Sequence, residues 1–303
     1  MSEYQYYQFL AVDRPLTAAE QAEVRQLSSR ARITATSFTN EYHWGDFRGS
    51  PEAMMRRYYD AHLYLANWGT HQIMLRLPRA LLDPKVARQF SVDGHLDVSA
   101  TREHVILDMT SRDEEGDWAE GAEDSLPAIV GVRAELAAGD LRPLYLAWLA
   151  AYGTWERDED AFTDDHEDED EPPVPAGLGS LSAPQRALAD FLRLDADMLE
   201  VAAEASPPPA DPIAEAHALA AHLAKLPSED KDRLLTLVAR DQAPQARREL
   251  LRGIPAPKRH RDASPRRTVA ELLDTAGALR LRREKQAAAQ QVVPELPHMA
   301  ERQ

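Results

Sequence analysis

The chain of 303 residues contains no cysteine. Disulfide bonds, thiolate zinc sites, iron–sulfur clusters and a cysteine nucleophile are therefore excluded. The sequence also lacks an apolar run near the roughly 20 residues that cross a bilayer, and its N-terminus has no basic stretch followed by an apolar one. We expect a cytoplasmic protein that is not bound to a membrane.

Motifs that bind nucleotides or activate a nucleophile are missing as well. The sequence contains neither GxGxxG nor GxxxxGKS/T, and it has no GxSxG and no HExxH. We therefore favour a non-enzymatic function and expect no cofactor.

Charge is unevenly distributed along the chain. Acidic residues outnumber basic ones by 51 to 35, and residues 156–171 contain 11 acidic residues and one basic residue. Residues 247–285 contain 12 basic and five acidic residues. Because affinity for nucleic acids comes largely from Lys and Arg that neutralise phosphates, the net charge of −16 argues against nucleic acid as a general partner. An attraction between the two oppositely charged segments, weakened by salt, remains open.

Aromatic residues are scarce in the second half, because 18 of the 20 Phe, Tyr and Trp residues lie before residue 156. Aromatic residues favour a sheet, whereas Ala and Leu favour packed helices. The acidic, proline-containing stretch between the halves is typical of a disordered spacer. We predict an α+β fold with a small mixed sheet covered by helices. The predicted units are an aromatic-rich α+β domain (1–155), a disordered acidic linker (156–180), a helical module (181–255), and a basic linker, amphipathic helix and frayed tail (256–303).

Hydrophobic patterning and capping residues predict the elements of these units. Thr17 and Glu20 have the spacing of a capping box, and Ser50 followed by Pro51 starts a second helix that continues to Gly69. The predicted strands are 4–12, 33–44, 72–77 and 104–109. The predicted helices are 17–28, 51–68, 79–89, 126–138 and 140–152 in the first domain, and four short helices between 182 and 253 in the second.

One segment contains side chains that could form a chemical site. Glu41, His43 and Asp46 lie close together in sequence, and Glu41 and His43 share one face of a strand. Asp60 and His62 could approach them, and such a set could bind Zn²⁺ or another divalent ion and lower the pKa of a bound water. The simpler interpretation, which we prefer, is that His43 and Trp44 end the strand and Asp46 caps a turn. We therefore assign no metal ligand.

A basic stretch, Lys258 to Arg267, offers a third possibility, contact with the phosphates of RNA or DNA. It has no interleaved aromatic residues on which bases could stack. A solvated linker is the simpler interpretation.

The blocks YQYYQFLAVDRPLT, SFTNEYHWGDFRGSPE and AHLYLANWGT resemble a family of bacterial proteins of unknown function. The resemblance extends over residues 1–255. Since no activity is established for that family, it implies neither a catalytic residue nor a ligand.

These observations predict a non-enzymatic protein-interaction or adaptor protein with two tethered modules and another protein as its partner. A tether of about 20 residues would let two weak sites act together through effective concentration. The alternatives are a metal-dependent enzyme that uses Glu41, His43 and Asp46, and weak binding of nucleic acid by the basic C-terminal segment.

Overall fold

The centre of the fold is a seven-stranded sheet with the strand order β2-β3-β1-β4-β5-β7-β6. The computed structural model describes residues 4–113, 121–153, 169–209, 212–240, 242–252 and 267–291. The strands are β1 (Gln5–Leu10), β2 (Arg32–Ile33), β3 (Ser37–Tyr42), β4 (Ala61–Ala66), β5 (Thr70–Pro78), β6 (Leu96–Ala100) and β7 (His104–Arg112).

Every neighbouring pair of strands in this sheet is antiparallel. The α+β class is confirmed, but the prediction of a small mixed sheet is wrong. The short connections explain the difference, because β4–β5 and β6–β7 are joined by tight turns and a parallel pair would need a long crossover.

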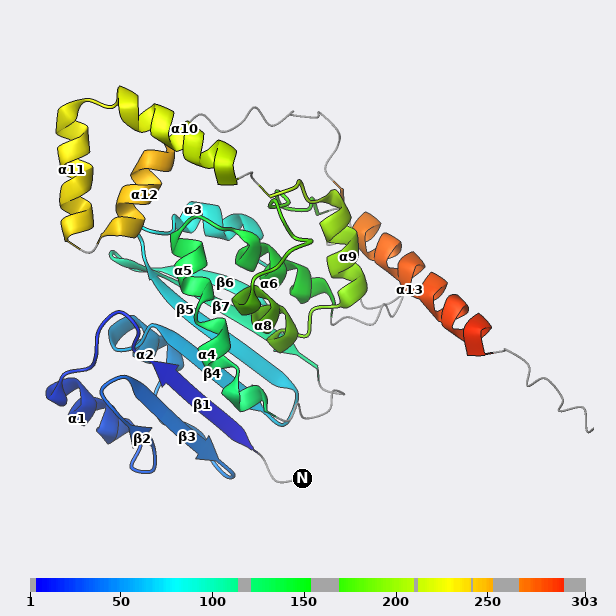
Figure 1. The fold of residues 1–303 in the computed structure, drawn as a ribbon. Coiled ribbons are helices and arrows are strands. Elements are labelled where there is room, and N and C mark those ends of the chain that lie inside the picture. Colours follow the sequence, from blue (N-terminus) through cyan, green and yellow to red (C-terminus); the bar gives the residue numbers. More distant parts are fainter. Residues whose placement is uncertain are drawn as a thin grey trace, which may run out of the picture.

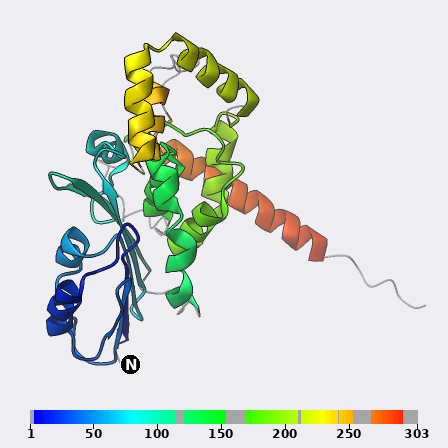
Figure 2. The same cartoon turned by 60° about the vertical axis from the view of Figure 1, so that its left-hand side comes forward.

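Helices cover both faces of the sheet (Figures 1 and 2). One face is covered by α1 (Ala18–Leu27) and α2 (Pro51–Arg57). The remaining helices are α3 (Pro84–Ala87), η1 (Arg88–Phe90), η2 (Ala122–Asp124), α4 (Leu126–Ile129), α5 (Val132–Ala137), α6 (Arg142–Gly153), α8 (Ala183–Phe191), α9 (Ala196–Ala205), α10 (Pro212–Lys225), α11 (Ser228–Ala239), α12 (Ala243–Arg252) and α13 (Val269–Gln291).

Successive side chains of β4 and β5 point to opposite faces of the sheet, and the buried residues therefore form two cores, one on each face. Leu63, Leu65, Ile73 and Leu75 face the larger core, which includes α4, α5, α6, α8 and α9. Helix α6 is buried along nearly its whole length and contacts α8, α9, β6 and β7. A helix that is apolar on all sides is expected to have packing partners all round, as α6 has.

The smaller core lies on the opposite face, under α1 and α2. Phe9, Phe38 and Tyr59 are fully buried there, and the ring centroid of Phe9 lies 5.5 Å from that of Phe38 and 5.4 Å from that of Tyr59. Such aromatic pairs add to the stabilisation that area burial supplies. Six of the 18 aromatic residues before residue 156 lie in strands β1, β3 and β4, and others, such as Tyr59 and Phe47, pack against the sheet in the smaller core.

The second predicted helix, 51–68, is wrong beyond Arg57. Ser50 caps α2, since its side chain accepts a hydrogen bond from Ala53 N, and Pro51 occupies the first turn. The chain then forms β4, whose pairing with both β1 and β5 outweighs the helical spacing of apolar residues. Strand β6 was not predicted, and the predicted strand 33–44 is divided into β2 and β3.

The predicted helix 126–138 is divided into α4 and α5. Gly131 lies at the division, and a Cβ atom at this position would come within 2.8 Å of Pro184 Cγ. Close approach of α8 therefore requires glycine here.

The larger core continues beyond the predicted linker. Leu188 and Phe191 of α8, Val201 of α9 and Leu272 of α13 belong to the same cluster as the sheet residues. His71 Nδ1 of β5 donates a hydrogen bond to the carbonyl oxygen of Phe191 at 2.8 Å. The structure therefore differs from the predicted division, because helices from residue 183 onward complete the core of the sheet.

The second part of the predicted disordered linker is ordered in the structure. Residues 154–168 lie outside the described residues, but Glu171 is buried, accepts a hydrogen bond from Tyr145 Oη and pairs with Arg267 at 2.7 Å. Leu178 belongs to the larger core. Specific partners for the acidic side chains thus overcome the charge repulsion that favours disorder.

Helices α10, α11 and α12 contact one another and lie at one end of the molecule (Figure 1). Their described residues belong to neither core, and Arg247 Nη1 donates to the carbonyl oxygen of Ala138 at 3.0 Å. Within the described ranges, no helix combines the length and apolar character that crossing a membrane requires.

His62 makes stability dependent on pH. Burial lowers the pKa of His62 to about 4, although a hydrogen bond to the carbonyl oxygen of Gln8 opposes the shift. The unfolded chain takes up this proton near the ordinary pKa of 6.5, so stability from neutral His62 is complete above that pH and is lost as the pH falls toward 4. The gap corresponds to about 3 kcal/mol.

We predict that His62→Phe, which keeps a ring against Phe9, removes this part of the pH dependence. Urea denaturation at pH 7 and pH 4 should show wild type losing about 3 kcal/mol more than the variant. His217→Phe, at an exposed position of α10, serves as the control and should leave the profile unchanged. Equal losses in wild type and His62→Phe would contradict the assignment.

Candidate functional site: an aromatic rim

Two tryptophans are exposed at the same end of the sheet. Trp44 follows β3 and is 79% exposed, and Trp68 follows β4 and is 43% exposed. Strand β1 pairs with both strands, and its Gln5 lies opposite Tyr42 and Ala66, the last residues of β3 and β4. The pairing register therefore places the two tryptophan loops on either side of the start of β1.

Tyr4 and His43 connect the two loops. The ring centroids of Tyr4 and His43 are 5.3 Å apart, and those of His43 and Trp44 are 6.3 Å apart. On the other side, Tyr4 N donates to Asn67 Oδ1 at 2.9 Å, and Asn67 N donates to the carbonyl oxygen of Tyr4 at 3.1 Å. We call the four residues Tyr4, His43, Trp44 and Trp68 the aromatic rim.

Tight turns hold the rim residues in place. Gly45 has φ +72° and Gly69 has φ +83°, a backbone conformation that glycine adopts without strain. Gly69 N donates to the carbonyl oxygen of Ala66 at 3.1 Å and closes the turn that presents Trp68. The tryptophans therefore extend from short loops supported by paired strands.

Carboxylates lie near the Tyr4 part of the rim. Burial raises the pKa of Tyr4 to about 12, and the negative charges of Glu41 and Glu123 add to the shift. Asp46 accepts a hydrogen bond from Gln5 Nε2 at 2.9 Å. The rim thus combines exposed aromatic faces with local negative charge, a combination that attracts cations through both ion pairing and cation–π contact.

The proposed metal-ligating residues do not converge. Glu41, His43 and Asp46 are exposed at the rim end of β3. His62 lies opposite Phe9, which in turn lies opposite Phe38 at the other end of β3, and Asp60 precedes β4 altogether. Asp60 and His62 therefore lie toward the opposite end of the sheet.

Asp60 is committed to a buried ionic network. Its Oδ1 accepts from Arg76 at 2.7 and 3.1 Å, and its Oδ2 accepts from the backbone of Val12 and Asp13 at 2.7 and 2.9 Å. Burial opposes ionisation, but the hydrogen bonds from Asp13 N and Arg76 outweigh it and lower the pKa of Asp60. Arg133 of α5 extends the network, because it pairs with Asp13 at 2.8 Å.

His62 is likewise unsuited to the metal hypothesis. Its ring stacks on Phe9 with centroids 3.9 Å apart, and its Nε2 has no hydrogen-bond partner among the described residues. The part of the chain that the structure describes contains no group of three or more His, Asp or Glu side chains arranged to hold a metal ion.

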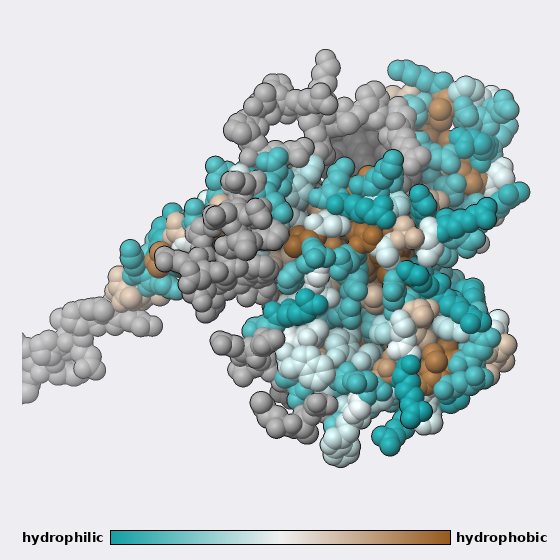
Figure 3. All heavy atoms as spheres, turned by 180° about the vertical axis from the view of Figure 1, so that it is seen from behind, coloured by the Kyte–Doolittle hydropathy of each residue, from teal (hydrophilic) through white to brown (hydrophobic). Residues whose placement is uncertain are grey.

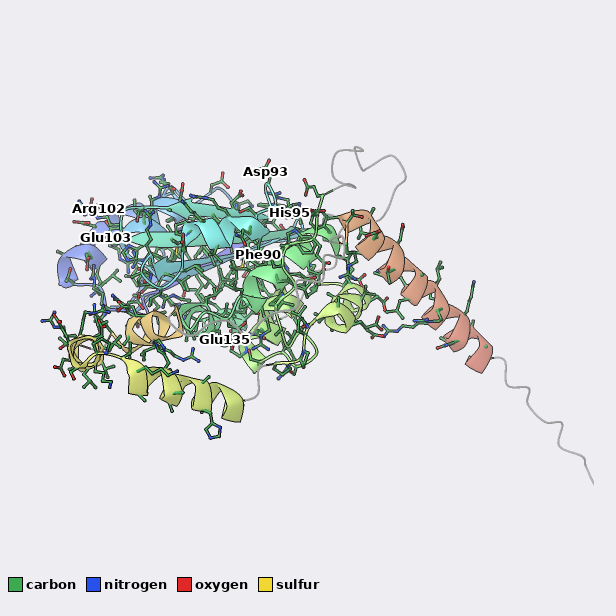
Figure 4. The ribbon with its side chains drawn as sticks, turned by 90° about the horizontal axis from the view of Figure 1, so that it is seen from above. Phe90, Asp93, His95, Arg102, Glu103 and Glu135 are labelled. Atoms are coloured by element: carbon green, nitrogen blue, oxygen red, sulfur yellow. The ribbon has the colours of Figure 1, made fainter. Side chains whose placement is uncertain are left out.

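Other polar groups on the sheet do not form a convergent site either. On the β6–β7 hairpin, Asp93 and His95 lie at the opposite end from Arg102 and Glu103 (Figure 4). Asp108 accepts two hydrogen bonds from Gln72 Nε2 at 2.8 and 2.9 Å, and burial raises its pKa. The α1 and α2 side of the molecule is mainly hydrophilic, with small and separate hydrophobic areas (Figure 3).

Sequence reasoning found half of the rim. The segment with Glu41, His43 and Trp44 was identified by its composition, whereas Tyr4 and Trp68 were not. Their proximity follows from the order β3-β1-β4, which the sequence did not predict. The available signal was a Trp-Gly pair directly after a buried strand, since such a turn leaves the tryptophan without a core to enter.

The basic stretch Lys258 to Arg267 lies outside the described residues except for Arg267. Arg267 pairs with buried Glu171 at 2.7 Å, so this guanidinium is used within the chain.

Comparison with known proteins supplies no further assignment. No family model, no curated protein and no solved structure matches the chain. This outcome is consistent with the resemblance to a family of unknown function.

Asp60→Asn tests whether this carboxylate is structural. Removing its charge leaves Arg76 buried without its ion-pair partner, and we expect a loss of about 3 to 5 kcal/mol in the free energy of unfolding. Chemical denaturation with and without EDTA provides the measurement. The loss should be the same in both, whereas an EDTA-dependent loss of stability in wild type alone would show that Asp60 holds a metal.

Proposed function

We propose that this protein is a non-enzymatic interaction or adaptor protein, and that its aromatic rim binds a basic segment of a partner protein. The observation that carries the proposal is the 79% exposure of Trp44 within a row of aromatic rings. Trp, Tyr and Arg are enriched at the energetic centres of interfaces, where burial of a large ring contributes most.

Charge supports a cationic partner. Glu41 and Glu123 act on Tyr4, and Asp46 adjoins Gln5 between the two loops. An Arg or Lys side chain could lie over an exposed ring while its charge faces these carboxylates. An acidic partner would be repelled at the same position.

Rigidity also supports binding. The rim residues adjoin strands β1, β3 and β4, which are hydrogen-bonded to one another, so little conformational entropy is lost when a partner binds. Helices α8 and α9 share the core of the sheet, so the sheet that carries the rim is supported by these helices as well.

The test uses the double variant Trp44→Ala, Trp68→Ala and a fluorescent 12-residue peptide rich in Arg and Leu. We expect micromolar binding to wild type and at least a tenfold loss in the double variant, about 1.4 kcal/mol or more. Fluorescence anisotropy at about 0.1 M salt provides the affinity, and thermal unfolding should be nearly unchanged because both side chains are exposed.

The matched control is Val12→Ser, since Val12 is 49% exposed beyond the opposite end of β1. This variant should bind the basic peptide as wild type does, and a peptide with Glu in place of Arg should not bind. Equal affinity of wild type and the double tryptophan variant, or failure of the basic peptide to bind wild type, would refute the proposal.

A further inference from the structure

Helix α13 continues beyond the body of the protein (Figure 1). Val269, Leu272, Ala276 and Leu279 are buried in the larger core, whereas every described side chain from residue 280 to 289 is exposed. The exposed part includes Leu281, at 57% exposure. This half of the helix therefore presents surface that the body does not cover.

One face of this helix borders an open space of about 540 Å³. We call this face the α13 strip, and its members are Ala278, Leu281, Arg282, Lys285, Gln286 and Ala289. Their separations of three and four residues place them together on one side of a helix. All the lining residues that the structure describes come from α13, so neither α9 nor the sheet supplies the opposite wall.

The strip has positive charge that the described residues do not neutralise. Arg280 and Arg283, on another side of α13, form ion pairs with Asp195, Asp197 and Glu200 of the α9 region. Arg282 and Lys285 form no ion pair with any residue in the described ranges. A covering segment should therefore be acidic and should bring some apolar surface for Leu281.

Residues 154–168 of the same chain have this composition. They contain eight carboxylates and one arginine, together with Trp155 and Phe162. The basic segment 253–266 would instead be repelled by Arg282 and Lys285.

Both ends of this acidic segment adjoin α13 or its partner helix. At one end, a Cβ atom on Gly153 would lie 3.4 Å from Asp195, the residue that pairs with Arg280. At the other end, the backbone N–H of Val269 donates to the carbonyl oxygen of Glu169 at 3.0 Å, and Val269 is the first residue of α13. The segment thus leaves near the middle of α13 and returns at its start.

The length of the segment is sufficient to follow the strip. Eleven residues separate Val269 from Arg280, which is about 16 Å along a helix, and Lys285 lies about 8 Å further. A chain of 15 residues can extend about 50 Å. It can therefore pass over Arg282 and Lys285 and still reach both fixed ends.

We propose that the acidic segment 154–168 binds the α13 strip of its own chain and neutralises Arg282 and Lys285. The contact is ionic and intramolecular. Attachment of the segment at both ends favours it, because it raises the effective concentration of the segment near the strip. Salt weakens it, because most of its charges lie at the surface. An acidic segment of another protein could reach the strip only by displacing this one.

The absence of native cysteine allows a direct test in the full chain. One variant combines Ala161→Cys with Ala278→Cys, which lies on the strip. Its matched control combines Ala161→Cys with Ala287→Cys, an exposed alanine on the opposite side of the helix. At low salt, we expect intramolecular disulfide formation to be at least tenfold faster in the first pair.

Adding Arg282→Glu and Lys285→Glu to the first pair should reduce this preference severalfold, as should about 0.5 M NaCl. Arg30→Glu with Arg240→Glu changes net charge equally at exposed positions elsewhere and should not reduce it. Equal rates in the two cysteine pairs, or a rate unaffected by reversal of the strip charges, would overturn the proposal. A product linked between two chains would overturn it as well, since it would identify a second copy as the occupant.

Discussion

The need to bury both faces of the central strands shapes the whole structure. Strands β4 and β5 present apolar side chains to the larger core and His62 and Met74 to the smaller one. Helices α1 and α2 cover one face, but the other requires α4, α5, α6, α8 and α9. The chain therefore returns to the sheet after residue 169, so that distant segments form one core. Burial of this kind is the main favourable contribution to folding.

Ion pairs that are largely buried join distant elements of this fold. The network of Asp13, Asp60, Arg76 and Arg133 joins the end of β1, the start of β4, β5 and helix α5. The ion pair of Glu171 and Arg267 likewise joins distant segments. It fixes the residues just before α13 next to Tyr145 of α6. With titratable groups used internally in this way, the rim remains as the place where aromatic side chains meet solvent beside carboxylates.

Local patterns predicted some elements well and others not at all. The capping box of Thr17 and Glu20 starts α1 as expected, and the alternation around residues 104–109 lies within β7. Strand β4 was mistaken for helix because Met54, Tyr58 and His62 have helical spacing, while its partners β1 and β5 are distant in sequence. The linker prediction failed at Glu171, since composition does not reveal that an arginine 96 residues later neutralises this acid and that a buried tyrosine donates a hydrogen bond to it.

The same reasoning explains the candidate site. Composition identified Glu41, His43 and Asp46. Asp60 and His62 would lie near them only if β1, β3 and β4 were paired in another register than the one observed. Conversely, strand order alone brings Tyr4 and Trp68 to His43 and Trp44. Which residues lie together at one end of the sheet depends on the pairing of strands that are distant in sequence, and this pairing could not be derived from periodicity.

Native-state hydrogen exchange tests most directly whether the sheet and the later helices form a single cooperative body. We expect the slowest amides of α8 and α9 to exchange with the same free energy as those of β4 and β5, because all four elements share one core. Exchange from α8 and α9 with an opening free energy several kcal/mol lower than that of the strands would contradict this account and restore a separate helical module.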